Sequence, residues 1–208
     1  MSYQQLNTFK LPYNFRGKPG WYTQLWWIIE ALFFRTSPQC MYGWRRFLLR
    51  SFGAKVGKAV IIRSTVRTQF PWRVSIGDYS WIGDDVVLYS LDKIHIGNHV
   101  VVSQKSYLCT GSHDYFRQDF PMNCLPIVLE DECWLATDVY VAPGVTIGKG
   151  TVVGARSSVF KSLPEGMVCM GSPAMAVRKR DNSEEKRIPV VSYGLHTVES
   201  ELMKVNAD

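Results

Sequence analysis

The chain has 208 residues, of which 46% are hydrophobic and 20% charged, and 24 Lys and Arg against 18 Asp and Glu give it a net charge of +6. These values are ordinary for a globular domain with or without appendages. They suggest disordered segments only at the two ends of the chain. The basic residues form no run interleaved with aromatic residues, so we expect no nucleic-acid partner. The five cysteines are scattered without C-x-x-C spacing, which favours reduced thiols in the cytoplasm over disulfides or a structural zinc site.

Residues 1–52 are predicted to form a cap of short helices. Apolar residues recur at helical spacing from Trp26 to Phe33 and again in WRRFLL, where several arginines give one side a basic character. The apolar run LWWIIEALFF is about half the roughly 20 residues that span a bilayer, and Glu30 interrupts it. No secretory signal is visible. The helices either shield the open end of the region that follows or contact an anionic membrane where lipid-linked polysaccharide precursors are built.

A six-residue repeat fills the middle of the chain. From Leu129 it reads LEDECW, LATDVY, VAPGVT, IGKGTV, VGARSS, VFKSLP, with Leu, Val or Ile always first. Upstream, triplets of inward positions begin at Val56, Ile76 and Ile96 and step by six. Ordinary strands show a period of two and helices spacings of three and four. A spacing of six therefore predicts an all-β solenoid with three short strands per turn over residues 53–180, followed by a tail over residues 181–208.

The repeats IGDYSW, IGDDVV, IGNHVV and IGKGTV resemble those of the hexapeptide-repeat acyltransferases. The resemblance covers roughly residues 47–180. The resemblance points to the colanic-acid biosynthesis and maltose/galactoside O-acetyltransferases, and it is carried by FGAKVGK, YLCTGSHDY and the region from VAPGVT to GSPA. It implies a left-handed parallel β-helix and a homotrimer with active sites between subunits. It also implies transfer of acetyl from acetyl-CoA to a hydroxyl of a sugar or polysaccharide unit, without a metal.

The repeat is interrupted after Leu108. The next coil should begin near residue 116 but resumes at Leu129, so thirteen extra residues leave the prism as a loop over about residues 111–126. His113 lies at the base of this loop. Acyl transfer from a thioester needs a base for the acceptor proton, and histidine, with an unperturbed pKa of about 6.5, suits that role. The resembling family has a histidine in this position, so we assign His113 as general base; the alternative is an exposed histidine without a role.

The acceptor side is assigned to three further residues. Asp114 would orient the imidazole or shape the loop, and Tyr115 would offer an aromatic surface to a sugar. Ser90 stands where the resembling family has an acceptor-binding Asn, which puts the sugar specificity in question. Cys109 is interpreted as a packed thiol rather than a covalent nucleophile.

The donor side is carried over from the resemblance, which implies that coenzyme A lies in a groove between subunits. The backbone amide of Thr137 would stabilise the developing oxyanion. Ala155 and Lys161 match positions that line the pantetheine and nucleotide end. Met175 replaces a basic residue of the family, and Arg178 would supply the phosphate contact instead.

Three alternatives stay open: an N-acetyltransferase acting on an amino-sugar nucleotide, a non-catalytic scaffold, and a zinc lyase. The β-helix carbonic anhydrases resemble this fold and hold zinc with three histidines. This chain has His95, His99, His113 and His196, and no second histidine follows His113 in the loop, so we expect no metal site. The prediction is a cytoplasmic acetyl-CoA-dependent O-acetyltransferase, at the inner face of the membrane if the cap binds lipid.

Overall fold

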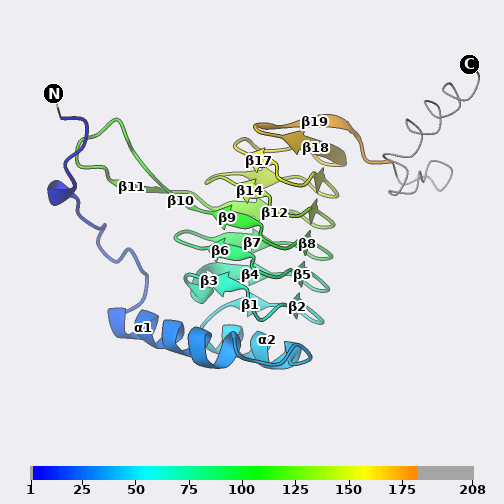
Figure 1. The fold of residues 1–208 in the computed structure, drawn as a ribbon, viewed down its shortest axis with the longest axis horizontal. Coiled ribbons are helices and arrows are strands. Elements are labelled where there is room, and N and C mark those ends of the chain that lie inside the picture. The colour runs from blue at the N-terminus through cyan, green and yellow to red at the C-terminus, as the bar shows by residue number, and fades with distance from the viewer. Residues whose placement is uncertain (1, 182–208) are drawn as a thin grey trace, which may run out of the picture.

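The structure is a computed structural model that describes residues 2–181, so nearly all of the predicted tail lies outside the described residues. Short strands stack into a three-sided prism, two helices lie across one end of it, and a long loop leaves one side (Figure 1). The predicted fold class, a parallel β-helix with short N-terminal helices and a protruding loop, is confirmed.

Each side of the prism is one sheet of mostly parallel strands. Sheet A contains β1 (Lys55–Val56), β4 (Val74–Ile76), β7 (Ile94–Ile96), β12 (Ile127–Leu129) and β15 (Thr146–Ile147). Sheet B contains β2 (Ile61–Ile62), β5 (Trp81–Ile82), β8 (Val101–Val102), β13 (Trp134–Leu135), β16 (Val152–Val153) and β18 (Met167–Gly171), closed by the antiparallel β19 (Ala174–Lys179). Sheet C contains β3 (Arg67–Thr68), β6 (Val87–Tyr89), β9 (Tyr107–Cys109), β14 (Tyr140–Val141) and β17 (Ser158–Val159).

The six-residue count identifies the core correctly. In sheet B the inward residues Ile62, Ile82, Val102, Leu135 and Val153 pair in register from coil to coil, and all are fully buried. Burial of each such side chain contributes about 1.5–3 kcal/mol. A coil can bury its interior only against its neighbours, and Val56 in the first coil, which has a neighbouring coil on one side only, is half-buried.

The glycine of the I-G repeat is required by the close approach of successive coils. A Cβ placed on Gly77 would lie 2.6 Å from the carbonyl carbon of Gly97 in the next coil, and one on Gly83 would lie 2.7 Å from the amide nitrogen of Gln104. Because backbone atoms cannot move aside as a flexible side chain can, only glycine fits at these two corners.

The N-terminal cap consists of α1 (Gly20–Ile29), the π-helical turn η2 (Glu30–Phe34) and α2 (Tyr42–Ser51). Its side chains satisfy the exposed backbone of the first coil. The indole Nε1 of Trp26 donates to the Thr68 carbonyl at 2.7 Å, and a Glu30 carboxylate oxygen accepts from the Thr68 N–H at 2.7 Å. The buried Arg45 donates to the Ile62 carbonyl at 2.6 Å. A sheet edge left unpaired beneath a helix would be costly, so these bonds fix the cap to the prism.

The basic side of α2 borders the first coil, and its three arginines bond backbone carbonyls there while Arg50 stays exposed. Besides Arg45, Arg46 donates to the Val60 carbonyl at 2.8 Å and Arg50 donates to the Val56 carbonyl at 2.6 and 2.9 Å. The helical spacing in the sequence predicts a basic side on this helix but does not predict which surface that side lies against. None of the helices within residues 2–181 has the length and apolar character that crossing a membrane requires.

The predicted loop starts as a hairpin. Strand β10 (Gly111–His113) pairs antiparallel with β11 (Met122–Cys124), and the chain then rejoins sheet A at β12. Two smaller excursions lie below it on the same corner, the first containing the short helix η3 (Pro71–Arg73).

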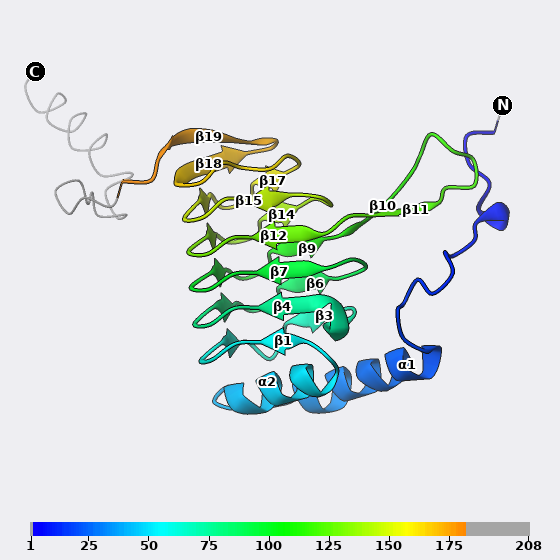
Figure 2. The ribbon, with the colours of Figure 1, turned by 180° about the vertical axis from the view of Figure 1, so that it is seen from behind.

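Residues 2–19, here called the strap, run from the cap along one side of the prism to the tip of this loop (Figure 2). The strap contains the short helix η1 (Leu6–Thr8). The Gln5 N–H donates to the Gln118 carbonyl at 2.8 Å, so the chain terminus and the loop support each other.

Candidate active site

His113 is held in one orientation at the end of β10. Its ring nitrogen Nδ1 lies 2.8 Å from the carbonyl oxygen of Phe120. A carbonyl can only accept, so Nδ1 carries the proton and Nε2 keeps the lone pair that a general base needs. The Phe120 ring also stacks on the imidazole, with centroids 4.2 Å apart and an interplanar angle of 10°. One residue therefore fixes both the tautomer and the plane of the ring.

Phe120 adopts a backbone conformation that is uncommon for a bulky residue, with φ of 47°. Such left-handed residues cost about 1–3 kcal/mol and persist only where the surroundings hold them. Here the Phe120 N–H donates to the Arg117 carbonyl at 3.1 Å, which closes the turn that directs the Phe120 carbonyl at His113. A second ring, Phe9 of the strap, lies 5.9 Å from the imidazole centroid. Neither residue belongs to the repeat, so the six-residue pattern gives no signal for either.

The three residues assigned to the acceptor side lie in different environments. Tyr115 is exposed near the tip of the loop, where its ring packs on Phe116. The Asp114 carboxylate accepts from the Phe116 N–H at 3.0 Å, so it shapes the loop turn. Ser90 is fully buried, and its hydroxyl bonds both the N–H and the carbonyl of Phe70. The Ser90 side chain therefore links two coils and is not presented to a ligand.

Thr137 and Ala155 lie on another corner, between sheets B and C. Thr137 follows β13 and Ala155 follows β16, and the Arg156 N–H donates to the Thr137 carbonyl at 2.9 Å, so the two corners stack directly. Within the described residues, the Thr137 N–H donates to no protein acceptor, although the amides on both sides of it do. The same holds for Ala155 and, one coil lower, for Gln104. This corner thus presents a column of unpaired N–H groups, which is a suitable lining for amide and thioester carbonyls.

The two cations assigned to coenzyme A are not brought together within one chain. Lys161 is exposed on the corner after β17, between sheets C and A, whereas Arg178 is exposed on β19 at the end of sheet B. Arg156 lies nearer the Thr137 corner, where its Nε is 3.7 Å from an Asp138 carboxylate oxygen.

A groove of about 410 Å³ adjoins the column of amides on its lower side. Its wall is the exposed indole of Trp81, and an ion pair between Arg63 and Asp84, 2.8 Å apart, lies at its edge. Ser103 and Gln104 add a hydroxyl and an amide. An aromatic face combined with polar groups that can both donate and accept is suited to a sugar.

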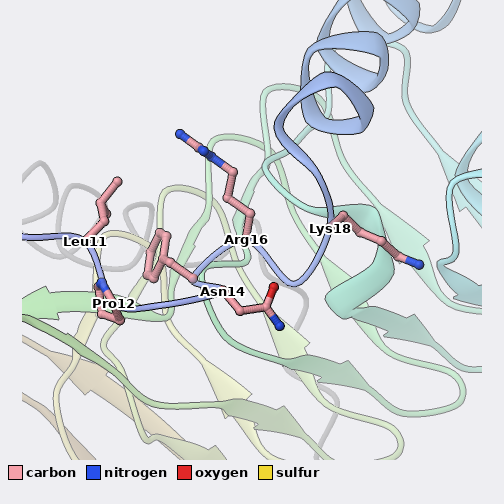
Figure 3. A pocket seen from close by; sticks show the side chains of 6 residues that line it. Leu11, Pro12, Asn14, Arg16 and Lys18 are labelled. Carbon is pink, nitrogen blue, oxygen red and sulfur yellow. The ribbon is translucent and has the colours of Figure 1, made fainter.

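A smaller pocket of about 160 Å³ is formed by the strap itself. Its two cations, Arg16 and Lys18, point in different directions (Figure 3). Because these charges do not converge on one point, the pocket contributes no group to the chemistry at His113.

The outer face of sheet C separates the two corners. It carries a ladder of rings from Tyr89 through Tyr107 and Tyr140 to Phe160, with successive centroids 6.0, 6.3 and 5.8 Å apart. Burial raises the pKa of Tyr140 to about 12. His113 leaves the prism at the C/A edge of this sheet and Thr137 lies at the B/C edge, so a single chain presents the histidine and the amide column on opposite edges.

Cys109, His95 and His99 each contact a different partner within residues 2–181. The Cys109 thiol donates to the Gly111 carbonyl at 3.2 Å, a packed position that matches the prediction. His95 contacts the Ser75 hydroxyl at 2.9 Å and His99 stacks on Tyr79. Within residues 2–181, no group of three or more His, Cys, Asp or Glu side chains could hold a metal ion.

Comparison with known proteins gives a consistent set of relatives. No family model matches the chain. A putative colanic acid biosynthesis acetyltransferase, WcaF, of Escherichia coli (strain K12) is 59% identical over 181 residues, which cover 87% of this chain and all of the relative. A galactoside O-acetyltransferase of Lactococcus lactis is 30% identical over 144 residues, covering 67% of this chain and 69% of the relative. A hexapeptide-repeat-containing acetyltransferase of Vibrio cholerae, solved with acetyl coenzyme A, superposes with a TM-score of 0.69 at 27% identity, covering 77% of this chain and 88% of that one.

Proposed function

The chain belongs to the hexapeptide-repeat acetyltransferases, and from this premise we propose that it transfers acetyl from acetyl-CoA to a sugar hydroxyl in a polysaccharide or lipopolysaccharide precursor. The observation that carries the proposal is His113, whose proton on Nδ1 is held by the Phe120 carbonyl and whose Nε2 is left as a base. The relatives support the reaction class, because they are named as acetyltransferases and one is solved with acetyl-CoA.

The reaction follows from the two corners. Nε2 of His113 takes the proton of the acceptor hydroxyl as its oxygen attacks the thioester carbonyl carbon. The Thr137 N–H donates to the oxyanion that develops. The C–S bond then breaks, the carbonyl re-forms, and the departing thiolate takes the proton from the imidazolium. Acetylated sugar and coenzyme A leave, and His113 returns to its neutral state.

The two corners can serve one reaction only if a second copy of the chain supplies one of them. We propose a homotrimer in which the three C sheets face the threefold axis. Each C/A edge, with His113, then adjoins the B/C edge of the next subunit, with Thr137, and the aromatic ladder of sheet C is covered. Such a heterologous interface closes into a ring when neighbouring subunits are related by one third of a turn. Lys161 and Arg178, separated within one chain, then serve different parts of the coenzyme A site.

The acceptor is proposed to occupy the groove beside Trp81, below the thioester. Its wall can stack on a sugar ring, and Asp84 and Gln104 can bond hydroxyls. Tyr115 on the neighbouring loop would close the groove from the other side. We place the reaction in the cytoplasm, where acetyl-CoA is available, and the cap at the inner face of the membrane.

The test is acetyl transfer measured as thiol release from acetyl-CoA with a panel of sugars, amino sugars and nucleotide sugars. Wild type should acetylate a hydroxyl acceptor, and His113→Ala should lose about 10²–10⁴-fold in kcat. His95→Ala, which removes an exposed histidine from another sheet, is the matched control and should keep full activity. Unchanged kcat in His113→Ala would contradict the base assignment, and transfer only to amines would favour an N-acetyltransferase.

A further inference from the structure

Helix α1 and the turn η2 are apolar on two opposite sides. The inner side, with Thr23, Trp26 and Phe34, is buried against the prism. A helix that is apolar on all sides is normally buried on all sides. Here the outer side is open to solvent, so the structure leaves a helix face without its partner.

The outer side is a continuous stripe of Trp21, Leu25, Ile28 and Leu32. Their spacings of four, three and four place them on one face, and their exposed fractions are 67%, 40%, 53% and 59%. Phe47 of α2 extends this stripe, hereafter the cap stripe: the Trp44 indole donates to the Phe33 carbonyl at 3.0 Å and the Phe47 ring stacks on Trp44. The cap lies across the end of the prism, at the opposite end from β19 (Figure 1).

The whole net charge of the protein lies in the same part of the chain. Residues 1–53 hold seven Lys or Arg and one acidic residue, and residues 54–208 hold seventeen of each, so the +6 belongs entirely to the strap and cap. The one acidic residue, Glu30, turns inward to the Thr68 N–H. The arginines of α2 bond neutral carbonyls rather than carboxylates, so their charge is not cancelled.

We infer that the cap stripe binds the surface of an anionic lipid bilayer, with its apolar side chains in the headgroup region and the cap's positive charge drawn to the lipid. Tryptophan, present at Trp21 and on the flank at Trp27, is enriched at such interfaces. The segment is too short to span a bilayer but long enough to lie in its plane. A second copy of the same face is the less suitable occupant, because it would bring two positively charged caps together. In a trimer three stripes would point the same way and bind with avidity.

The test is co-sedimentation of the full-length protein with vesicles of phosphatidylcholine alone and of phosphatidylcholine mixed with phosphatidylglycerol. Wild type should sediment with the anionic vesicles and be released by salt, because surface charge is screened at high ionic strength. Leu25→Asp with Ile28→Asp should weaken this binding by more than about tenfold. Met175→Asp with Val177→Asp, which makes the same change of charge and polarity on exposed residues of β19, should bind vesicles as wild type does.

A second variant keeps the inference falsifiable if the double Asp variant folds poorly. Lys18→Gln with Arg35→Gln leaves the stripe intact and should weaken binding to anionic vesicles several-fold. Wild type that stays in solution with anionic vesicles overturns the inference. Stripe variants that bind lipid normally but change the sedimentation coefficient overturn it too, because the stripe would then be a subunit contact. The proposed acetyl transfer is tested separately, with soluble acceptors and no lipid, so its failure and the failure of this inference are distinguishable.

Discussion

Glu30 makes the attachment of the cap sensitive to pH. Desolvation raises the pKa of its carboxyl from 4.5 to about 7, and the hydrogen bond from the Thr68 N–H offsets only part of that rise. Between about pH 4.5 and 7, the Glu30 carboxyl is therefore protonated in the folded protein but ionised in the unfolded chain. The stabilisation from this group is fully present below about pH 4.5 and is lost as pH rises through about 7. The difference of roughly 2.5 pKa units corresponds to about 3 kcal/mol.

Glu30→Gln tests this directly, because the amide oxygen can still accept from the Thr68 N–H but carries no charge. Denaturant unfolding of both proteins at a fixed concentration should give similar free energies of unfolding at pH 4, and at pH 8 the variant should be more stable by up to about 3 kcal/mol. A difference between the two proteins that is the same at pH 4 and pH 8, or a variant that loses stability relative to wild type as pH rises, would refute the desolvation of Glu30.

Two further predictions concern the loop and the coil contacts. Phe120→Ala removes the ring that stacks on His113 and should lower kcat about three- to tenfold, while the KM for acetyl-CoA stays unchanged. The control variant Phe120→Tyr keeps the ring and should retain kcat. A kcat in Phe120→Ala equal to that of wild type would show that the stack is dispensable. Gly77→Ala places a Cβ against the backbone of Gly97 and should lower the free energy of unfolding by about 2–3 kcal/mol. Gly20 has open space around it, so Gly20→Ala should leave the stability unchanged. Equal stability of the two variants would contradict the close spacing of the coils.

The repeat could be predicted from the sequence because each strand of a β-helix buries one residue at a fixed interval. Leu108 and Leu129 mark where the interval fails, and the loop leaves the prism between them. His113 could be assigned from its place at the base of that loop and from the family resemblance.

The support of His113 could not be predicted in the same way. It depends on the left-handed backbone of Phe120 and on Phe9, which is 104 positions away in the chain. The family resemblance assigns Ser90 to the acceptor side. In the structure the side chain of Ser90 is buried, and its hydroxyl bonds the backbone of Phe70. The separation of His113 and Thr137 on two edges of sheet C follows from the corner each one occupies, which the strand order defines.

The central claim is that one active site uses His113 from one chain and the Thr137 corner from the next. His113→Ala removes the base, and Ala155→Trp fills the exposed corner above Thr137 without burying a new side chain in the core. Each homotrimer should be inactive. Differently tagged copies, co-expressed and purified as mixed oligomers, should regain about one third of wild-type activity, because in every mixed trimer one of the three interfaces joins an intact loop to an intact corner. Mixed oligomers with no activity would place the whole site within one chain and contradict the account.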